Sequence, residues 1–162
     1  MADTPRFTVR VQPDRFDPGA ELNAFTARTA NAGAVVSFTG LMRDYSRDSQ
    51  ARGETLTAMT LEHYPGMAER QLADLLVEAR RRWAIDDATV IHRHGVLTPG
   101  EAIVFVAAAS AHREAAFAAA EFLMDWLKTQ APFWKKETGA RGAAWVEAHA
   151  GDTARAAKWQ RS

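Results

Sequence analysis

Apolar residues recur along the chain with two different spacings, and each spacing predicts a kind of element. Segments 6–12 and 56–64 alternate apolar and polar residues, which is typical of strands with one exposed face. After Pro65-Gly66 the apolar residues fall at helical spacing instead, which predicts an amphipathic helix that runs to about residue 83. The residues on this helical stripe are Leu72, Leu75, Leu76, Ala79 and Trp83.

Apolar runs of the kind found in buried strands predict strands at 34–41 and 102–109. Further strands are predicted at 88–94, 133–138 and 143–147, and further helices at 21–30 and 112–130. Strands and helices alternate, but hairpin-like pairs of strands intervene. We therefore predict an α+β fold, in which a mixed sheet with two packed helices adjoins a smaller antiparallel portion. A length of 162 residues fits one domain, here 1–150. We expect the polar tail, 151–162, either to fray or to dock on another chain.

The segment 42–55 contains three arginines and almost no residue suited to a core. It is long for an unstructured connection inside one domain, which favours either a function or mobility. One interpretation is a disordered surface loop. The other is a lid that brings Arg43, at the end of the preceding strand, over an anionic ligand.

The start of the predicted helix 112–130 has the features of an anion site. Ser110 is the expected N-cap, and His112 and Arg113 fall in the first turn. Backbone N–H groups at a helix N-terminus attract anions, and an arginine adds a bidentate donor for phosphate. The compensating anion is either a ligand phosphate or simply Glu114 with solvent.

Lysine is rare in this chain and is concentrated in one stretch. The chain has four lysines against sixteen arginines, and three of the four are Lys128, Lys135 and Lys136. A lysine in a partly buried pocket can lose its proton and act as a base or nucleophile, whereas an arginine stays charged. The alternative is that these are solvated lysines near a helix end. On the predicted strand, Lys135 and Glu137 share one face and Lys136 lies on the other.

Composition excludes several classes of protein. The absence of cysteine rules out disulfides, thiolate metal sites and a cysteine nucleophile. A net charge of zero argues against nucleic-acid binding, and no apolar run is long enough to span a membrane. No apolar leader is visible at the N-terminus, so we expect a cytoplasmic protein. His92 and His94 share a strand face, but without a third ligand at a telling distance we expect no metal site.

Four segments together resemble the large, catalytic subunit of molybdopterin synthase. They are GAVVSFTGLMRD (33–44), LEHYPGMAER (61–70), VIHRHGVLTPGEAIVFVAAASAHREAAF (90–117) and FLMDWLKTQAPFWKKE (122–137). The resemblance covers roughly residues 33–147. It implies an α/β hammerhead fold with an antiparallel subdomain and no bound cofactor.

The resemblance also implies an activity and partners. The family converts cyclic pyranopterin monophosphate to molybdopterin, by installing two sulfurs as a dithiolene. Sulfur arrives as a C-terminal thiocarboxylate on a small ubiquitin-like subunit that ends in Gly-Gly. Two large subunits form a homodimer with one small subunit at each end, which makes a heterotetramer. The lack of cysteine fits, because the sulfur never has to reside on the large subunit.

The site residues follow from the resemblance, residue by residue. The essential lysines of the family fall on Lys128 and Lys135, which we expect to act on the thiocarboxylate and on proton transfers. The residues expected to bind substrate are Leu41, Met42, Arg43, His112, Arg113, Lys128, Lys135, Lys136 and Glu137. Which of the two lysines is the base is left open.

Two other hypotheses compete with the enzyme. The chain could be a binding module that docks a ubiquitin-like tail without chemistry, its lysines attracting only the terminal carboxylate. It could also be an arginine-lined phosphate- or RNA-binding protein, which the zero net charge disfavours.

Overall fold

The computed structural model describes residues 6–147 and 150–161. In chain order the elements are β1 (Phe7–Gln12), α1 (Pro18–Arg28), β2 (Ala34–Leu41), α2 (Arg47–Ala51), β3 (Leu56–His63), α3 (Met67–Arg82), β4 (Asp87–Arg93), β5 (Gly95–Leu97), β6 (Ala102–Ser110), α4 (Arg113–Thr129), β7 (Phe133–Gly139), β8 (Gly142–Val146), α5 (Ala150–Ala157) and the 3₁₀ turn η1 (Lys158–Arg161). The ends of the predicted domain and tail, at residues 1–5, 148–149 and 162, lie outside the described residues.

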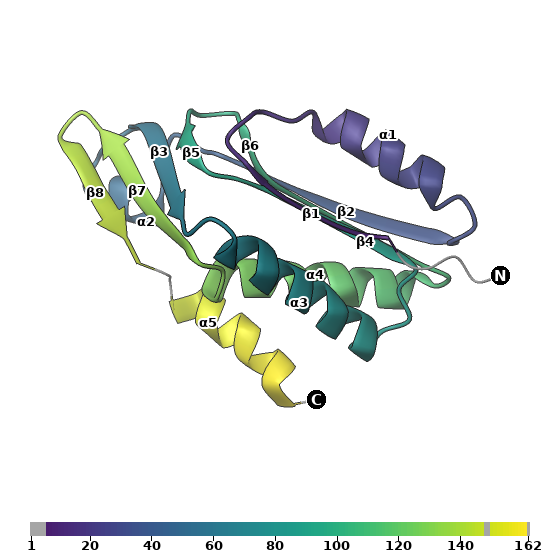
Figure 1. Ribbon diagram of the computed structural model, residues 1–162. Coiled ribbons are helices and arrows are strands. Elements are labelled where there is room, and N and C mark those ends of the chain that lie inside the picture. Colours follow the sequence, from purple (N-terminus) through teal and green to yellow (C-terminus); the bar gives the residue numbers. More distant parts are fainter. Residues whose placement is uncertain (1–5, 148–149, 162) are drawn as a thin grey trace.

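The strands form two four-stranded sheets. The first has the order β1-β4-β6-β2 and is mixed, because β1 runs parallel to β4 while the other neighbours are antiparallel. The second has the order β5-β3-β7-β8 and is antiparallel throughout. Figure 1 shows the second sheet at one end of the first. The predicted α+β class, with a mixed sheet and a smaller antiparallel portion, is confirmed.

Helices cover both faces of the first sheet (Figure 1), because successive side chains of a strand point to opposite faces. Val106 of β6 packs with Leu76 and Leu123 in the core beneath α3 and α4. Its neighbour Phe105 packs with Phe25 in a second core beneath α1. The sheet is therefore buried on both sides. A third, smaller core lies where the second sheet meets the first.

Helix α1 and strand β5 differ from the prediction. Helix α1 begins at Pro18 rather than at residue 21, because the side chain of Asp17 accepts from the N–H groups of Gly19 and Ala20. A proline at the first helical position suits this start. The segment 95–101, between the predicted strands 88–94 and 102–109, contains a further strand, β5, which pairs with β3.

The loop 42–55 is built rather than unstructured. It contains α2, which begins with a capping box between Ser46 and Ser49. Backbone bonds from Leu56 to Asp44 and from Glu54 to Ser49 close the loop onto itself. The interpretation as a disordered surface loop is therefore wrong for the folded chain.

The C-terminal segment packs on its own chain. Helix α5 lies against α4, and Trp159 of η1 makes edge contacts with Trp83 and Phe122. The indole Nε1 of Trp159 donates to the buried carboxylate of Asp125 at 2.7 Å. The described part of the tail, 151–161, is thus helical and docked.

Candidate functional site

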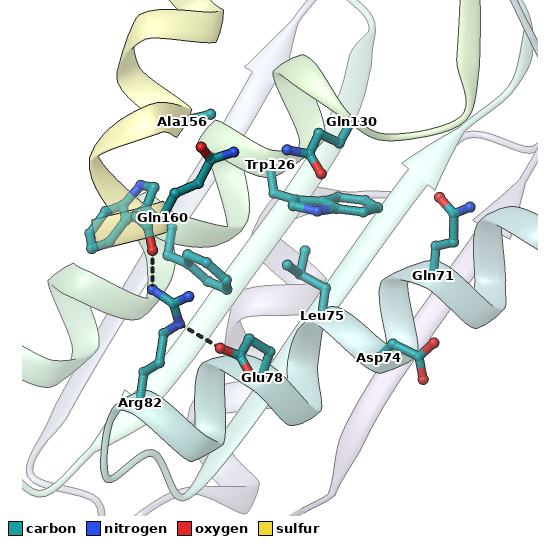
Figure 2. Close-up of a pocket in the computed structure, with 11 residues that line it drawn as sticks. Gln71, Asp74, Leu75, Glu78, Arg82, Trp126, Gln130, Ala156 and Gln160 are labelled. Atoms are coloured by element: carbon teal, nitrogen blue, oxygen red, sulfur yellow. Dashed lines mark hydrogen bonds and ion pairs between the residues drawn. The ribbon is translucent and has the colours of Figure 1, made fainter. Parts of the chain in front are cut away.

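A cleft of about 490 Å³ lies where the two sheets, the C-terminal end of α4 and the start of α5 meet. Its floor is apolar, with Met59 and Leu61 of β3 and Leu127 of α4 among the lining residues. Lys128 and Lys135 both line this cleft. Another cavity, of about 440 Å³, lies between α3, α4 and the C-terminal segment (Figure 2) and is lined by no lysine.

The chain reverses sharply between the two lysines. Lys128 lies in the last turn of α4, and Pro132 cannot continue the helix. The chain therefore turns back at once into β7, which pairs with β3 and places Lys135 opposite Leu61. The change from helix to strand within seven residues thus brings the amines of Lys128 and Lys135 into one cleft.

Burial lowers the pKa of Lys128. The side chain lines the cleft, although part of it is exposed, and burial against the cleft is the largest cause of the shift. The positive charges of Lys135 and Arg43 lower the pKa further, and Asp152 of α5 acts in the opposite direction. Lys128 therefore releases its proton more readily than an ordinary lysine.

Lys135 is held by a buried carboxylate. Glu137, two residues further along the same face of β7, is only 3% exposed and lies 3.5 Å from the Lys135 amine. Its other oxygen accepts a hydrogen bond of 2.9 Å from the hydroxyl of Ser46 in the 42–55 loop. The capping box of α2 fixes Ser46 in turn. Lys135 is thus oriented by a chain of polar contacts that begins in the loop.

The residues that follow β2 form another wall of the cleft. Leu41, Met42 and Arg43 all line it. Met42 is buried and anchored by backbone bonds to Gly100 and Glu101. The guanidinium of Arg43 stacks over the ring of Tyr45 at 4.7 Å. Arg43 therefore lies beside the cleft, as the lid interpretation expected.

Lys136, Arg113 and His112 do not line the cleft. Lys136 points to the opposite face of β7, where its amine lies 5.4 Å from the ring of Trp145. His112 and Arg113 begin α4, and 15 residues of helix put Arg113 about 22 Å from Lys128. In a single chain the predicted anion site at the start of α4 is therefore separated from the lysines.

The cap of α4 also differs from the prediction. His112, not Ser110, is the N-cap residue, and its side chain makes no capping bond. The hydroxyl of Ser110 donates to the carbonyl of Ala84 and accepts weakly from the N–H of His112. The hydroxyl of Ser110 thus ties the end of β6 to the loop between α3 and β4.

Sequence reasoning missed several residues of the cleft. His92, Ser46, Asp152 and Arg155 all line it. The serine spacing of the capping box, S-x-x-S, was a signal for Ser46. No local pattern indicated that α5 would return to the lysines. Within the described residues, no group of three or more His, Asp or Glu could hold a metal ion, and no helix is long and apolar enough to cross a membrane.

The fold and the cleft together define a class: an α+β protein in which paired lysines and an arginine surround a site with an apolar floor. Residues 11–130 match the MoaE protein family, which is most of the chain. The chain belongs to this family, and the resemblance seen in the sequence is confirmed.

Individual relatives agree with this assignment. The chain is 55% identical to the molybdopterin synthase catalytic subunit of Cereibacter sphaeroides, over 93% of this chain and 99% of the relative. The molybdopterin biosynthesis MoaE protein of Burkholderia ambifaria superposes with a TM-score of 0.78 at 46% identity, and the match covers 96% of this chain and 99% of that one. A complex of subunits 1 and 2 of the molybdopterin-converting factor from Helicobacter pylori shares the fold, with a TM-score of 0.69 at 15% identity, over 87% of this chain and 90% of that one.

Proposed function

We propose that the chain is the catalytic subunit of a molybdopterin synthase. In this function it is a cytoplasmic sulfurtransferase that converts cyclic pyranopterin monophosphate to molybdopterin. The sulfur comes from the C-terminal thiocarboxylate of a small ubiquitin-like subunit. The observation that carries the proposal is the convergence of Lys128 and Lys135 on one cleft, in a chain that belongs to the MoaE family.

The cleft suits an anionic substrate and an acyl-sulfur donor. Lys135, oriented by Glu137, presents a fixed positive charge to a carboxylate-like group. Lys128, with its lowered pKa, is the better candidate for proton transfer. Arg43 lies at the rim, where its guanidinium can bind a phosphate. The apolar floor gives the reacting groups a surface from which water is largely excluded.

Partner chains complete the proposal. A relative from Helicobacter pylori has been solved as a complex of two subunits, which supports a small-subunit partner for this chain. We also propose a homodimer, within a heterotetramer. A second copy is required if Arg113 is to bind the substrate, because α4 holds Arg113 about 22 Å from Lys128 of its own chain.

An assay of molybdopterin formation tests the proposal. It combines the chain, the pterin precursor and a small subunit that carries a thiocarboxylate. We expect product with the wild type, and almost none with Lys128→Ala or Lys135→Ala, although both variants fold. Lys158→Ala is the matched control, because this lysine pairs with Glu121 and does not line the cleft. A complex that forms with the wild type but gives no product would favour the binding module instead.

A further inference from the structure

The first half of the 42–55 loop lines the cleft, yet few contacts hold the loop in place. In the described part of the chain, two side-chain hydrogen bonds join the loop to other elements. One is the bond from Ser46 to Glu137, and the other is made by Glu54 near the far end of the loop. Both bonds reach the hairpin of β7 and β8, which also carries Lys135. The loop is therefore fastened to the same hairpin that supplies a lysine of the site.

The carboxylate of Glu54 binds the turn of this hairpin. Its Oε1 accepts a hydrogen bond of 3.0 Å from the backbone N–H of Arg141, which lies between β7 and β8. Its Oε2 lies 3.2 Å from Nε of Arg52 within the loop, and the side chain of Glu54 is only 7% exposed. The N–H of Arg141 and the guanidinium of Arg52 both lower the pKa of Glu54, so the carboxylate is charged near pH 7.

Gly139, the last residue of β7, leaves the space that this carboxylate occupies. A Cβ at position 139 would lie 2.7 Å from the carboxyl carbon of Glu54 and closer still to Oε1, nearer than such atoms approach each other. The φ angle of Gly139 is not in the left-handed region, so its backbone conformation does not call for glycine. The close approach of Glu54 is therefore the reason for a glycine at this position.

The strand pairing beside this contact is irregular. The register between β3 and β7 shifts between Leu56 and Ala58, where Leu56 pairs with Gly139. A bulge of this kind interrupts the ladder and bends the strand locally. The regular ladder is thus interrupted close to the loop, and Glu54 adds a bond between the loop and the hairpin at that place.

We propose that Glu54 is a positioning residue that fastens the 42–55 loop to the β7–β8 hairpin, and so holds the loop arginines Arg43 and Arg47 at the cleft. The proposal rests on the function proposed above. Glu54 does not line the cleft, whereas both arginines do, so Glu54 acts through the loop. A loop that is already ordered loses less conformational entropy when a ligand binds. Glu54 therefore affects the binding of the anionic substrate more than the chemical step.

Substitutions of Glu54 test this role in the assay of molybdopterin formation. We expect Glu54→Ala to raise KM for the pterin precursor by about tenfold and to change kcat by less than about twofold, because the cost of ordering the loop is added to binding. Glu54→Gln keeps an oxygen that accepts from the N–H of Arg141, so it should restore most of the affinity. Arg141→Ala is the matched control, because it keeps the backbone N–H that Glu54 binds.

Gly139→Ala tests the close approach independently. With Glu54 present, the added methyl group should displace the carboxylate and reproduce the rise in KM seen with Glu54→Ala. In a chain that already carries Glu54→Ala the methyl group has room, so Gly139→Ala should change KM by less than about twofold. Equal effects of Gly139→Ala in the two backgrounds would overturn the proposal, since the glycine would then serve something other than Glu54.

Hydrogen exchange measured by nuclear magnetic resonance tests the fastening without substrate. The amide of Arg141 should exchange slowly in the wild type, because Glu54 accepts its proton. In Glu54→Ala we expect this amide to exchange at least about tenfold faster, and the amides of α2 to follow because the loop is released. Arg141→Ala should leave the exchange of α2 unchanged.

The outcomes separate this proposal from the proposed function. If the wild type forms no product, the proposed function fails, while hydrogen exchange still decides whether Glu54 holds the loop. Wild-type exchange in Glu54→Ala overturns the fastening. Faster exchange with KM unchanged, or a fall in kcat alone, overturns the positioning role, because a purely structural contact would give either result. If the variants do not fold, the wild type decides: a Glu54 carboxyl that titrates below its ordinary pKa supports the proposal, and an ordinary pKa overturns it.

Discussion

The two lysines of the cleft influence each other, so substitution of one changes the chemistry of the other. The charge of Lys135 is the second cause, after burial, of the lowered pKa of Lys128. We predict that Lys135→Met raises the pKa of Lys128, because a nearby positive charge is removed. Titration of the lysine side chains by nuclear magnetic resonance measures this. Lys136→Met, on the opposite face of β7, is the control, and an unchanged or lower pKa in Lys135→Met would contradict the prediction.

A buried neutral histidine makes stability depend on acid. The folded pKa of His92 is about 4 and the ordinary value is 6.5, so between these values the unfolded chain binds a proton that the folded chain refuses. This contribution to stability is complete above pH 6.5 and is lost as the pH falls toward 4. From pH 7 to 4.5 the loss is about 2 kcal/mol.

Urea unfolding at the two pH values, with wild type and His92→Phe, measures this loss. We predict that the free energy of unfolding of the wild type falls by about 2 kcal/mol more than that of the variant. All other titrating groups are shared by the two proteins, so the difference isolates His92. Equal acid sensitivity of both proteins would mean that His92 is not buried in its neutral form.

At the scale of elements, the cap of the short helix α2 links the 42–55 loop to the cleft. The hydroxyl of Ser46 caps α2 and also donates to the buried carboxylate of Glu137. We predict that Ser46→Ala lowers the free energy of unfolding by about 1–3 kcal/mol, because a buried charge loses a donor and a helix loses its cap. Product formation should fall as well, since Glu137 orients Lys135.

Thermal and urea unfolding, together with the synthase assay, test this prediction. Ser37→Ala is a suitable control, because Ser37 is exposed on β2 and makes no side-chain hydrogen bond among the described residues. If Ser46→Ala matched the control in both stability and turnover, the contact of Ser46 with Glu137 would have no role in stability or catalysis.

Trp159 of the C-terminal segment should contribute to the stability of the fold. Trp159 contacts Trp83 and Phe122 and donates to Asp125. We predict that Trp159→Ala lowers the free energy of unfolding by about 2–3 kcal/mol, less than for a fully buried tryptophan because the ring is only partly covered. Trp145→Ala, at a position 57% exposed, should change it by less than about 0.5 kcal/mol. Equal effects in urea unfolding would show that η1 is not docked in solution.

Elements could be predicted where an apolar pattern repeats regularly over many residues. They were missed where the element depends on a contact with a segment distant in sequence. The stripe of α3 and the alternation of β1 and β3 needed no other information. Strand β5 has only three residues and exists because β3 supplies a partner from more than 30 residues earlier. Helix α5 is polar in sequence and is held by α4. For β5 and α5 the stabilising partner lies outside any local window.

At the scale of the whole molecule, the candidate site illustrates the same limit. Lys128 and Lys135 were assigned to one site by resemblance, and the turn between α4 and β7 does bring both to one cleft. His112 and Arg113 were assigned to the same site by resemblance, but helix geometry places Arg113 about 22 Å from Lys128 in one chain. The spacing of 15 residues was already visible in the sequence. Arg113 and Lys128 can share one substrate at this separation only if they come from two different chains.

A complementation experiment therefore tests whether the site is built from two chains. If Arg113 of one copy serves Lys128 of the other, an Arg113→Ala chain paired with a Lys128→Ala chain has one site with both changes and one intact site. We predict that each variant alone is nearly inactive. Random mixing makes about half of the dimers heterodimers, so co-refolded chains should recover about a quarter of wild-type product formation.

The control for this experiment pairs Lys128→Ala with Lys135→Ala. Both lysines line the same cleft of one chain, so every site in the mixed dimer lacks one of them, and we expect no recovery. Separate affinity tags allow the heterodimer to be purified, and it should then have about half of the wild-type activity, from one intact site of two. Full activity of Arg113→Ala alone would remove this residue from the site. Absence of recovery in the first pair would show that Arg113 does not act on the cleft of a second copy.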